Sequence, residues 1–312
     1  MSRNFGIGSR DMGMAGQFAL NNATKDGSVS FSTASTNGER WQSFTAWAKD
    51  HDVKKMENFT QELVTQYGRD LAEKVNDGKL SPATAQNYVS AVNSVMAIAT
   101  KNEWKSVSPT KDCNIPQRSM IRQEAPGAIN NTTVIQVIAL VQEKLGDRAA
   151  AVVELARSLG LRSKEASLIN ARAALKQALT KESVTVGYGT KGGFAREVPI
   201  TSPAQLQVLE RAAAAQGGDR SMIPAGQSWR TWRESTLREA RKVVQERTGG
   251  GLHDLRASYA CQRYQTMTGQ PAPCTGALIK DRAGDLVARK LIAKELGHSR
   301  FEVTAEYVGG RK

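Results

Sequence analysis

Apolar residues recur at helical spacing along most of this chain, and this regularity limits its fold more than any other feature. Between residues 39 and 105 three segments show it, and the third opens with Ser81 as N-cap and Pro82 at the first helical position. Helical spacing resumes at Thr133 and continues at 149–159, then at about 203–215, 230–247, 252–266 and 282–296. The sequence therefore predicts a mainly α-helical protein.

One stretch departs from this pattern. Residues 184–186 and 197–200 are strand-like and flank a glycine-rich turn, which predicts a small β-hairpin or a three-stranded sheet. Gly187, Gly189 and Gly192 in that turn match the dinucleotide-binding spacing Gly-x-Gly-x-x-Gly. That motif has meaning only between a strand and a helix, and here a strand follows. We therefore reject a nucleotide-binding interpretation.

Two segments without periodicity suggest how the chain is divided. Residues 1–38 are rich in Gly, Ser, Asn and Thr, which predicts a flexible N-terminal arm, with a short helix plausible at 14–20. Residues 106–132 contain Pro109, Pro116 and Pro126 and are typical of a linker. We expect a helical domain at 39–105 and a larger domain at 133–312.

Charge and cysteine content narrow the class of protein. The 312 residues include 43 Lys and Arg against 30 Asp and Glu, a net charge of +13, which favours a polyanionic partner without choosing among DNA, RNA and anionic lipid. No apolar run reaches the roughly 20 residues that span a bilayer, and no leader is evident, so we expect a cytoplasmic protein. Three cysteines without close pairing argue against disulfides and zinc and favour buried or incidental thiols.

The second half carries short motifs in a fixed order. They are Gly-Leu-Arg-Ser-Lys-Glu around Arg162, the glycine-rich turn with Lys191, His-Asp-Leu-Arg from His253 to Arg256, Leu-Gly-His ending at His298, and Tyr307 nine residues later. Two of the three histidines fall in these motifs. The series closely resembles the signature of the tyrosine recombinases, or phage integrases: Arg, Lys, His-x-x-Arg, His or Trp, then Tyr. We interpret the chain as a mobile-element integrase of this kind.

The resemblance implies a role for each motif. Tyr307 would attack a DNA phosphate, and the resulting phosphotyrosine link conserves the bond energy, so the step is reversible. Arg162 and Arg256 would present forks of donors to the non-bridging oxygens and stabilise the transition state. His298 would donate a hydrogen bond to the same phosphate.

Proton transfer falls to other residues in this interpretation. Lys191 would protonate the leaving 5′-oxygen, with Lys181 as a less favoured candidate. His253 shares a helical face with the arginine three residues later and is the better of the two histidines to take the tyrosine proton. Glu165 would either orient the site or be a helix-surface charge, and His51 is expected at the surface.

The resemblance covers about residues 39–312 and implies an architecture. The string at 80–88 is similar to part of the core-binding domain that precedes the catalytic domain in this family, and the two domains would form a C-shaped clamp on DNA. We expect a recombinase that acts through a 3′-phosphotyrosine and a Holliday junction, without metal or cofactor. Its partners would be double-stranded DNA at a recombination site, three further copies of itself in a tetramer on two duplexes, and an accessory directionality or host DNA-bending protein, placing it at the nucleoid.

Two departures and several alternatives remain open. The interval from Arg256 to His298 is 42 positions, which indicates an insertion at about 264–282, and only five residues follow Tyr307. The basic, tryptophan-containing stretch at 229–233 is equally compatible with a DNA-facing helix and with tryptophans in the core. Alternative functions are a type IB topoisomerase or telomere resolvase, and a non-catalytic DNA-binding relative. An RNA-binding module is disfavoured because exposed aromatic motifs are lacking.

Overall fold

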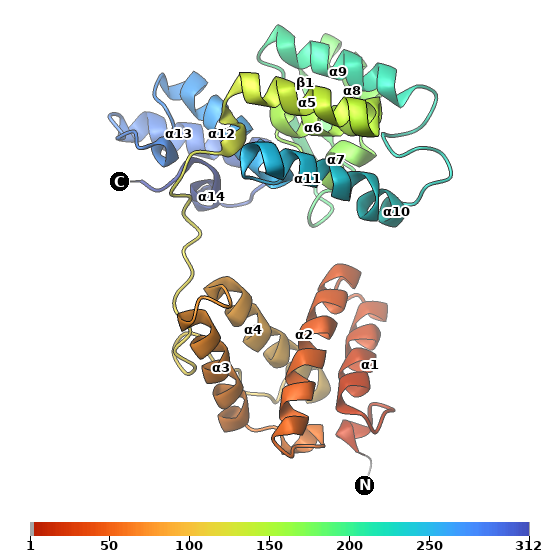
Figure 1. Ribbon diagram of the computed structural model, residues 1–312, viewed down its shortest axis with the longest axis vertical. Helices are drawn as coiled ribbons and strands as arrows, with labels where there is room; N and C mark the ends of the chain where they lie inside the picture. The colour runs from red at the N-terminus through yellow and green to blue at the C-terminus, as the bar shows by residue number, and fades with distance from the viewer. Residues whose placement is uncertain (1–2, 312) are drawn as a thin grey trace. The chain divides into compact units, whose positions relative to one another are not determined.

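The computed structural model describes residues 3–311, which form two compact units, one ending at Ser119 and the other beginning at Met120 (Figure 1). Each unit has its own hydrophobic core. Both are built mainly of helices, as the sequence predicts, and the boundary falls inside the expected linker. Residues 1–2 and 312, which the expected arm and last domain include, lie outside the described part. No helix among the described residues is long and apolar enough to span a bilayer.

The first unit is a bundle of four helices: α1 (Met12–Lys25), α2 (Phe31–Asp50), α3 (Gln61–Asn76) and α4 (Pro82–Ala99). Single 3₁₀ turns lie at Asn4–Gly6 and Met56–Asn58. The caps of α4 follow the sequence, because the side chain of Ser81 accepts a hydrogen bond from the N–H of Thr84 at 3.2 Å. Trp41, Phe44 and Tyr67 form the centre of this core.

The described part of the expected arm, residues 3–38, differs from the prediction, because α1 and the start of α2 occupy most of it. Met12, Ala15 and Leu20 of α1 are buried against α2. The glycines explain why the sequence resembled an unstructured segment. A Cβ on Gly16 would lie 2.0 Å from the Trp41 indole nitrogen, which donates to the Met12 carbonyl at 2.9 Å. These small residues permit close helix packing rather than disorder.

The expected linker at 106–132 is ordered over both of its halves. Val107, Cys113 and Ile115 are buried in the core of the first unit. Further along, the backbone N–H of Arg122 donates to the carbonyl of Ala305 at 2.9 Å, and Ala128 is buried in the core of the second unit. Each half therefore packs on its own unit.

The second unit is organised around two helices, α6 (Asp147–Leu159) and α12 (Leu252–Thr268), which are labelled in Figure 1. Ten of the 13 residues of α6 and 11 of the 17 residues of α12 are buried, so both run through the core. In chain order the elements are η3 (Gly127–Ile129), α5 (Asn131–Leu145), α6 (Asp147–Leu159), α7 (Ser163–Leu168), α8 (Ala171–Lys181), β1 (Ser183–Val186), β2 (Arg196–Pro199), α9 (Pro203–Gln216), α10 (Trp229–Glu234), α11 (Thr236–Thr248), α12 (Leu252–Thr268), η4 (Pro273–Thr275), α13 (Arg282–Glu295), η5 (Phe301–Thr304) and α14 (Ala305–Val308).

The predicted hairpin is present as two antiparallel strands. β1 pairs with β2 so that Val184 lies opposite Val198 and Val186 opposite Arg196. No third strand joins them within residues 3–311. The alternating pattern turns Val184, Val198 and Arg196 toward the core, and this brings a buried arginine to the site described below.

The helix expected at 230–247 is divided at Ser235, whose backbone leaves the helical region (φ −109°, ψ −93°). In α10 the indole of Trp232 is buried and donates to the hydroxyl of Ser167 at 3.1 Å, whereas Arg230 and Arg233 are exposed. The structure thus places one tryptophan of this stretch in the core. The expected insertion at 264–282 comprises the end of α12, a loop and η4.

Candidate active site around Tyr307

Tyr307 lies on the short helix α14, inside a cluster of residues from distant parts of the chain. Its ring centroid is 5.3 Å from the ring of His253 and 5.5 Å from the ring of His298. The guanidinium carbon of Arg256 lies 5.7 Å from the same centroid. The side chain is 2% exposed, so the ring closes over the arginine. The structure therefore assembles Tyr307 with these three groups within one chain.

Arg256 is fully buried on α12, one turn from His253. It donates to the carbonyl oxygens of Gly160 and Leu296, and its Nη2 lies 3.4 Å from Nε2 of His298. Its Nε is buried without a hydrogen-bond partner among the described residues. Burial lowers the pKa of Arg256 to about 10, so the guanidinium stays charged at neutral pH. The cluster thus holds a permanent cation beneath the tyrosine.

Arg162 enters the site at the start of α7. Gly160 adopts a left-handed conformation (φ +62°), where a Cβ would lie 2.5 Å from the Tyr259 ring, and this turn brings Arg162 to the N-cap. The backbone N–H of Arg162 donates to Glu165 Oε2 at 2.7 Å, and its Nη1 donates to Oε1 at 2.8 Å. The arginine is about one-fifth exposed and can meet a ligand from solvent.

Glu165 is fully buried and compensates the positive charge of the site. Besides Arg162 it receives a bidentate pair from Arg196, at 2.8 and 2.7 Å, and Nη1 of Arg256 lies 3.8 Å from Oε2. Burial opposes ionisation, but the hydrogen bonds and charge of Arg196 and Arg162 hold the pKa of Glu165 below its usual range. Of the two interpretations that the sequence left open, the orienting one fits these contacts.

The two histidines of the cluster are held in the neutral form. Burial first, and then the charges of Arg256, Arg162 and Arg196, lower the pKa of His298 to about 4. Burial and the charges of Arg256 and Arg162 lower the pKa of His253 as well. A neutral imidazole can accept a proton, which an imidazolium cannot. His51, in contrast, is exposed in the first unit, as expected.

Lys191, the predicted general acid, lies in the turn between β1 and β2 and is exposed. The turn packs closely on α7, because a Cβ on Gly189 would lie 3.1 Å from backbone atoms of Lys164. Lys181, the alternative, is exposed at the end of α8.

Sequence reasoning missed Arg196 and the pair formed by Arg122 and Asp254. Arg196 also donates to the Glu295 carbonyl at 2.7 Å. The one sequence feature that could have indicated its burial is its place on the same strand face as Val198. Asp254 follows His253 and binds both the Arg122 side chain and the backbone N–H of Gly127 at 2.7 Å. These contacts join the segment that opens the second unit to the start of α12, and no sequence pattern signalled them.

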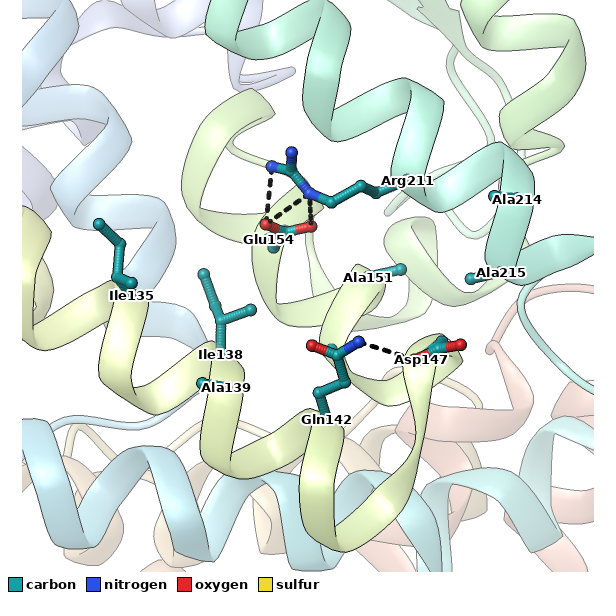
Figure 2. A pocket seen from close by; sticks show the side chains of 11 residues that line it. Ile135, Ile138, Ala139, Gln142, Asp147, Ala151, Glu154, Arg211, Ala214 and Ala215 are labelled. Atoms are coloured by element: carbon teal, nitrogen blue, oxygen red, sulfur yellow. Dashed lines mark hydrogen bonds and ion pairs between the residues drawn. The ribbon is translucent and has the colours of Figure 1, made fainter.

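One hollow of the second unit lies apart from these residues. It has a volume of about 570 Å³ and lies between α5, α6 and α9, where Glu154 and Arg211 form an ion pair at 2.9 Å (Figure 2). Its lining includes none of the six predicted catalytic residues.

Comparison with known proteins agrees with the fold. The family model of the Integrase family matches residues 117–262. No curated protein sequence matches the chain.

Several solved structures share the fold over nearly the whole chain. XerH site-specific recombinase bound to a palindromic difH substrate has a TM-score of 0.59 and 15% identity, covering 95% of this chain and 80% of that one. A lambda integrase tetramer bound to a Holliday junction has a TM-score of 0.55 and 14% identity, covering 94% and 76%. The Tn1549 transposon integrase with transposon right-end DNA has a TM-score of 0.55 and 10% identity, covering 95% of both chains.

At these identities the structural likeness establishes the fold, which this chain shares with XerH, lambda integrase and the Tn1549 integrase. The Integrase model matches a part of the second unit and the end of the first, residues 117–262, which agrees with the resemblance found in the sequence.

Proposed function

We propose that this protein is a site-specific DNA recombinase that cuts and rejoins DNA through a 3′-phosphotyrosine at Tyr307. The freed 5′-hydroxyl of a second duplex then attacks the link, and strand exchange passes through a Holliday junction. Tyr307, Arg162, Lys191, His253, Arg256 and His298 carry the chemistry. No metal or nucleotide has a role in these steps, because the tyrosine link itself conserves the bond energy.

One observation carries this proposal: Tyr307 is packed against Arg256 and between two neutral histidines. Guanidinium donors suit the charge that develops on a phosphate under attack, and a neutral imidazole suits removal of the phenol proton. A phenol surrounded by such groups is better suited to phosphoryl transfer than to packing alone.

The described conformation also requires a movement before cleavage. Arg256 is fully buried and Tyr307 covers it, so a phosphate cannot reach the guanidinium while the ring stays in place. Binding of DNA must therefore lift or turn the tyrosine and let the phosphate replace it over Arg256. The unpartnered Nε of Arg256 offers a free donor in that position.

The leaving 5′-oxygen needs a proton, and Lys191 is assigned to supply it. Lys191 is exposed in the hairpin turn. The same turn packs against α7, the helix that begins directly after Arg162. Closure of that turn on bound DNA would bring the ammonium group to the leaving oxygen. His253 takes the proton of the tyrosine in the forward step.

The proposed substrate is double-stranded DNA, held by a tetramer on two duplexes. A net charge of +13 supports a polyanionic partner. Among the proteins that share the fold, lambda integrase forms a tetramer bound to a Holliday junction, and XerH binds its difH substrate. By analogy, the first unit would be a core-binding domain and the two units together a clamp. An accessory protein that sets direction remains part of the proposal.

Covalent trapping tests this function. A binding site would be selected from a random pool of duplexes, and a nick would be placed near the cleavage point so that the short product strand is lost. Native protein is expected to give a covalent band on a denaturing gel without magnesium, and Tyr307→Phe is expected to give none. Tyr88→Phe, which removes a hydroxyl from the first unit, is the matched control and should react like the native protein.

The products then separate the remaining candidates. Exchange of strands between two duplexes supports a recombinase, relaxation of supercoils alone indicates a type IB topoisomerase, and hairpin ends indicate a telomere resolvase. Tight binding with no covalent band from the native protein would overturn the catalytic proposal and leave a non-catalytic DNA-binding relative.

A further inference from the structure

Two buried thiols meet beneath the helix that carries Tyr307. Cys261 lies on α12 and Cys274 in η4, and their sulfurs are 3.5 Å apart. Both residues are at most 3% exposed. They are separated along the chain by the loop of the expected insertion, whereas the third cysteine, Cys113, lies in the first unit. The pair is therefore a local feature of the second unit.

Both thiols contact the backbone of the proposed nucleophile. Cys261 Sγ lies 3.5 Å and Cys274 Sγ 3.7 Å from the carbonyl oxygen of Tyr307. A thiol is a weak donor, but two of them directed at one buried oxygen can hold it in place. The same oxygen belongs to the residue whose phenol must move onto a phosphate, so its position matters for the reaction.

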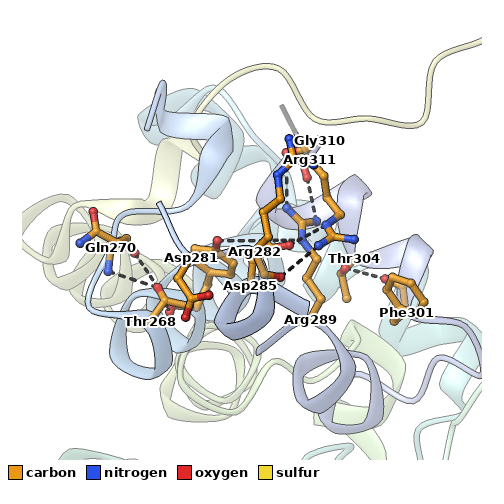
Figure 3. A network of polar contacts seen from close by, with 12 residues as sticks. Thr268, Gln270, Asp281, Arg282, Asp285, Arg289, Phe301, Thr304, Gly310 and Arg311 are labelled. Atoms are coloured by element: carbon orange, nitrogen blue, oxygen red, sulfur yellow. Dashed lines mark hydrogen bonds and ion pairs between the residues drawn. The ribbon is translucent and has the colours of Figure 1, made fainter. Parts of the chain in front are cut away.

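Hydrogen bonds and ion pairs hold the residues after Tyr307 in place, so this segment cannot shift to accommodate a movement of the two sulfurs. Arg289 donates to the Gly309 carbonyl at 2.9 Å, and the buried Asp285 binds both Arg289 and Arg311 at 2.7 Å (Figure 3). Gly309 has a φ of +93°, and a Cβ there would lie 2.5 Å from the Cys274 backbone nitrogen. Because these contacts hold the residues after Tyr307, a displacement of the two sulfurs must move Tyr307 itself.

We propose that Cys261 and Cys274 form a redox modification site, in which oxidation to a disulfide switches off strand cleavage by Tyr307. A disulfide requires a sulfur separation of about 2.0 Å, so the sulfurs must move together from 3.5 Å. Oxidation also removes both thiol hydrogens, and the Tyr307 carbonyl loses both donors. The switch rests on the proposed function, because it acts on that cleavage step.

A hydroperoxide supplies the oxidising equivalents. The sulfur of Cys274 attacks one oxygen of hydrogen peroxide, the O–O bond breaks and water leaves, which yields a sulfenic acid. The sulfur of Cys261 then attacks that sulfur and displaces a second water. The two thiols lose two electrons and two protons in total, and the peroxide gains them.

The order of attack follows from the environment of the pair. The contact with the Cys261 thiol, helped by the charge of Arg122 and opposed by burial, lowers the pKa of the Cys274 thiol. The same contact and burial raise the pKa of Cys261. Thiolate character selects the sulfur that attacks peroxide, so Cys274 reacts first and Cys261 resolves the intermediate.

The test uses the full-length protein with hydrogen peroxide as the oxidant and the nicked duplex as the substrate. Peptide mass mapping of the folded, oxidised protein is expected to show a disulfide between Cys261 and Cys274. The rate of covalent adduct formation is expected to fall by about 100-fold, the scale of a roughly 1 Å misplacement of a reacting group, and dithiothreitol should restore it.

Variants separate this site from other oxidation. Cys274→Ser lacks the thiol that attacks peroxide, so its rate should be the same before and after peroxide, whatever its basal rate. Cys261→Ser can reach only the sulfenic acid at Cys274, so mass mapping should find no disulfide in it. Cys113→Ser keeps the pair and should remain as sensitive as the native protein. Either serine variant suffices if the other fails to fold.

The outcomes distinguish the switch from the function on which it rests. Absence of the Cys261–Cys274 disulfide in folded, peroxide-treated protein would overturn the modification site. A complete disulfide with an unchanged cleavage rate would overturn the switch while leaving cleavage intact. A reduced protein that binds the duplex but never becomes linked to it would instead overturn the proposed function.

Discussion

At the scale of residues, the candidate site is a concentration of positive charge balanced by a single buried carboxylate. Arg162, Arg196 and Arg256 converge on Glu165, and burial together with the surplus positive charge keeps His253 and His298 neutral. A phosphate would supply the missing negative charge. The arrangement therefore indicates a site that is completed by an anion.

Replacement of Glu165 by Gln should destabilise the second unit strongly. Removing one member of a buried ionic network leaves the remaining charges unpaired, which costs about 3–5 kcal/mol. The free energy of unfolding from urea titration measures this loss. Glu246→Gln, the same change at an exposed position of α11, should cost less than about 0.5 kcal/mol. Equal stability of the two variants would show that Glu165 does not hold the cluster together.

The histidines predict a pH dependence of stability. The pKa of His298 is about 4 in the folded protein against an ordinary value of 6.5, so the unfolded chain binds more protons between these values. Stability should therefore fall as the pH drops from about 6.5 to about 4, with His253 contributing in the same direction. In His298→Gln the fall over this window should be smaller, whereas His51→Gln should retain it. Melting temperatures across the window test the sign.

Lys191 lies exposed in the turn between β1 and β2, and its proposed role is to protonate the leaving oxygen. As a general acid it should contribute about 10²–10⁴-fold to single-turnover cleavage, and Lys191→Ala should lose that factor. A substrate with sulfur in place of the leaving 5′-oxygen should restore the rate, because a thiolate leaves without a proton. Lys181→Ala serves as the matched control. If sulfur fails to rescue Lys191→Ala but rescues Lys181→Ala, the general acid is Lys181.

At the scale of elements, the packing of α1 against α2 depends on glycines. In the sequence, these same glycines contributed to the prediction of a flexible arm. Gly16→Ala places a methyl group within 2.0 Å of the Trp41 indole, and overpacking of this kind typically costs about 1–3 kcal/mol. The melting temperature of the first unit should fall accordingly. Gly218→Ala adds the same methyl to open space and should have little effect. An unchanged melting temperature for Gly16→Ala would instead support a flexible arm.

Helices with strong end signals could be predicted from the sequence, and others could not. The cap at Ser81 located the start of α4, because local backbone chemistry decides it. The short helix expected at 14–20 is present within α1, but its full length and its packing on α2 were not expected in a segment rich in Gly, Ser and Asn. α7 was missed because it spans only six residues, and its N-terminus is built by a salt bridge rather than by a usual capping residue.

The site could be predicted in part, for a similar reason. The motif residues on α12 and around α14 stand in a recognisable order, and the structure brings four of the six together with Arg162 beside them. For Arg196, the only local indication of burial was the alternating pattern of a four-residue strand. For Arg122, no local pattern indicated its ion pair. Ion pairs formed between distant segments leave little trace in a single sequence.

At the scale of the whole molecule, two units with separate cores share one basic chain, and the second contains Tyr307 and the residues around it. Arg289, Asp285 and Arg311 fasten the short tail to α13 of the same chain. The tail therefore stabilises the site of its own protomer in this conformation. Any exchange between copies would have to release these contacts or use another surface.

Mapping of the trapped adduct tests the central claim most directly. Native protein would be linked to the nicked duplex, digested with nuclease and protease, and sequenced by mass spectrometry to locate the nucleotide. We expect a nucleotide phosphate on the phenolic oxygen of Tyr307, joined to the 3′ end of the cleaved strand. A nucleotide on any other side chain, or a link to the 5′ end, would contradict it.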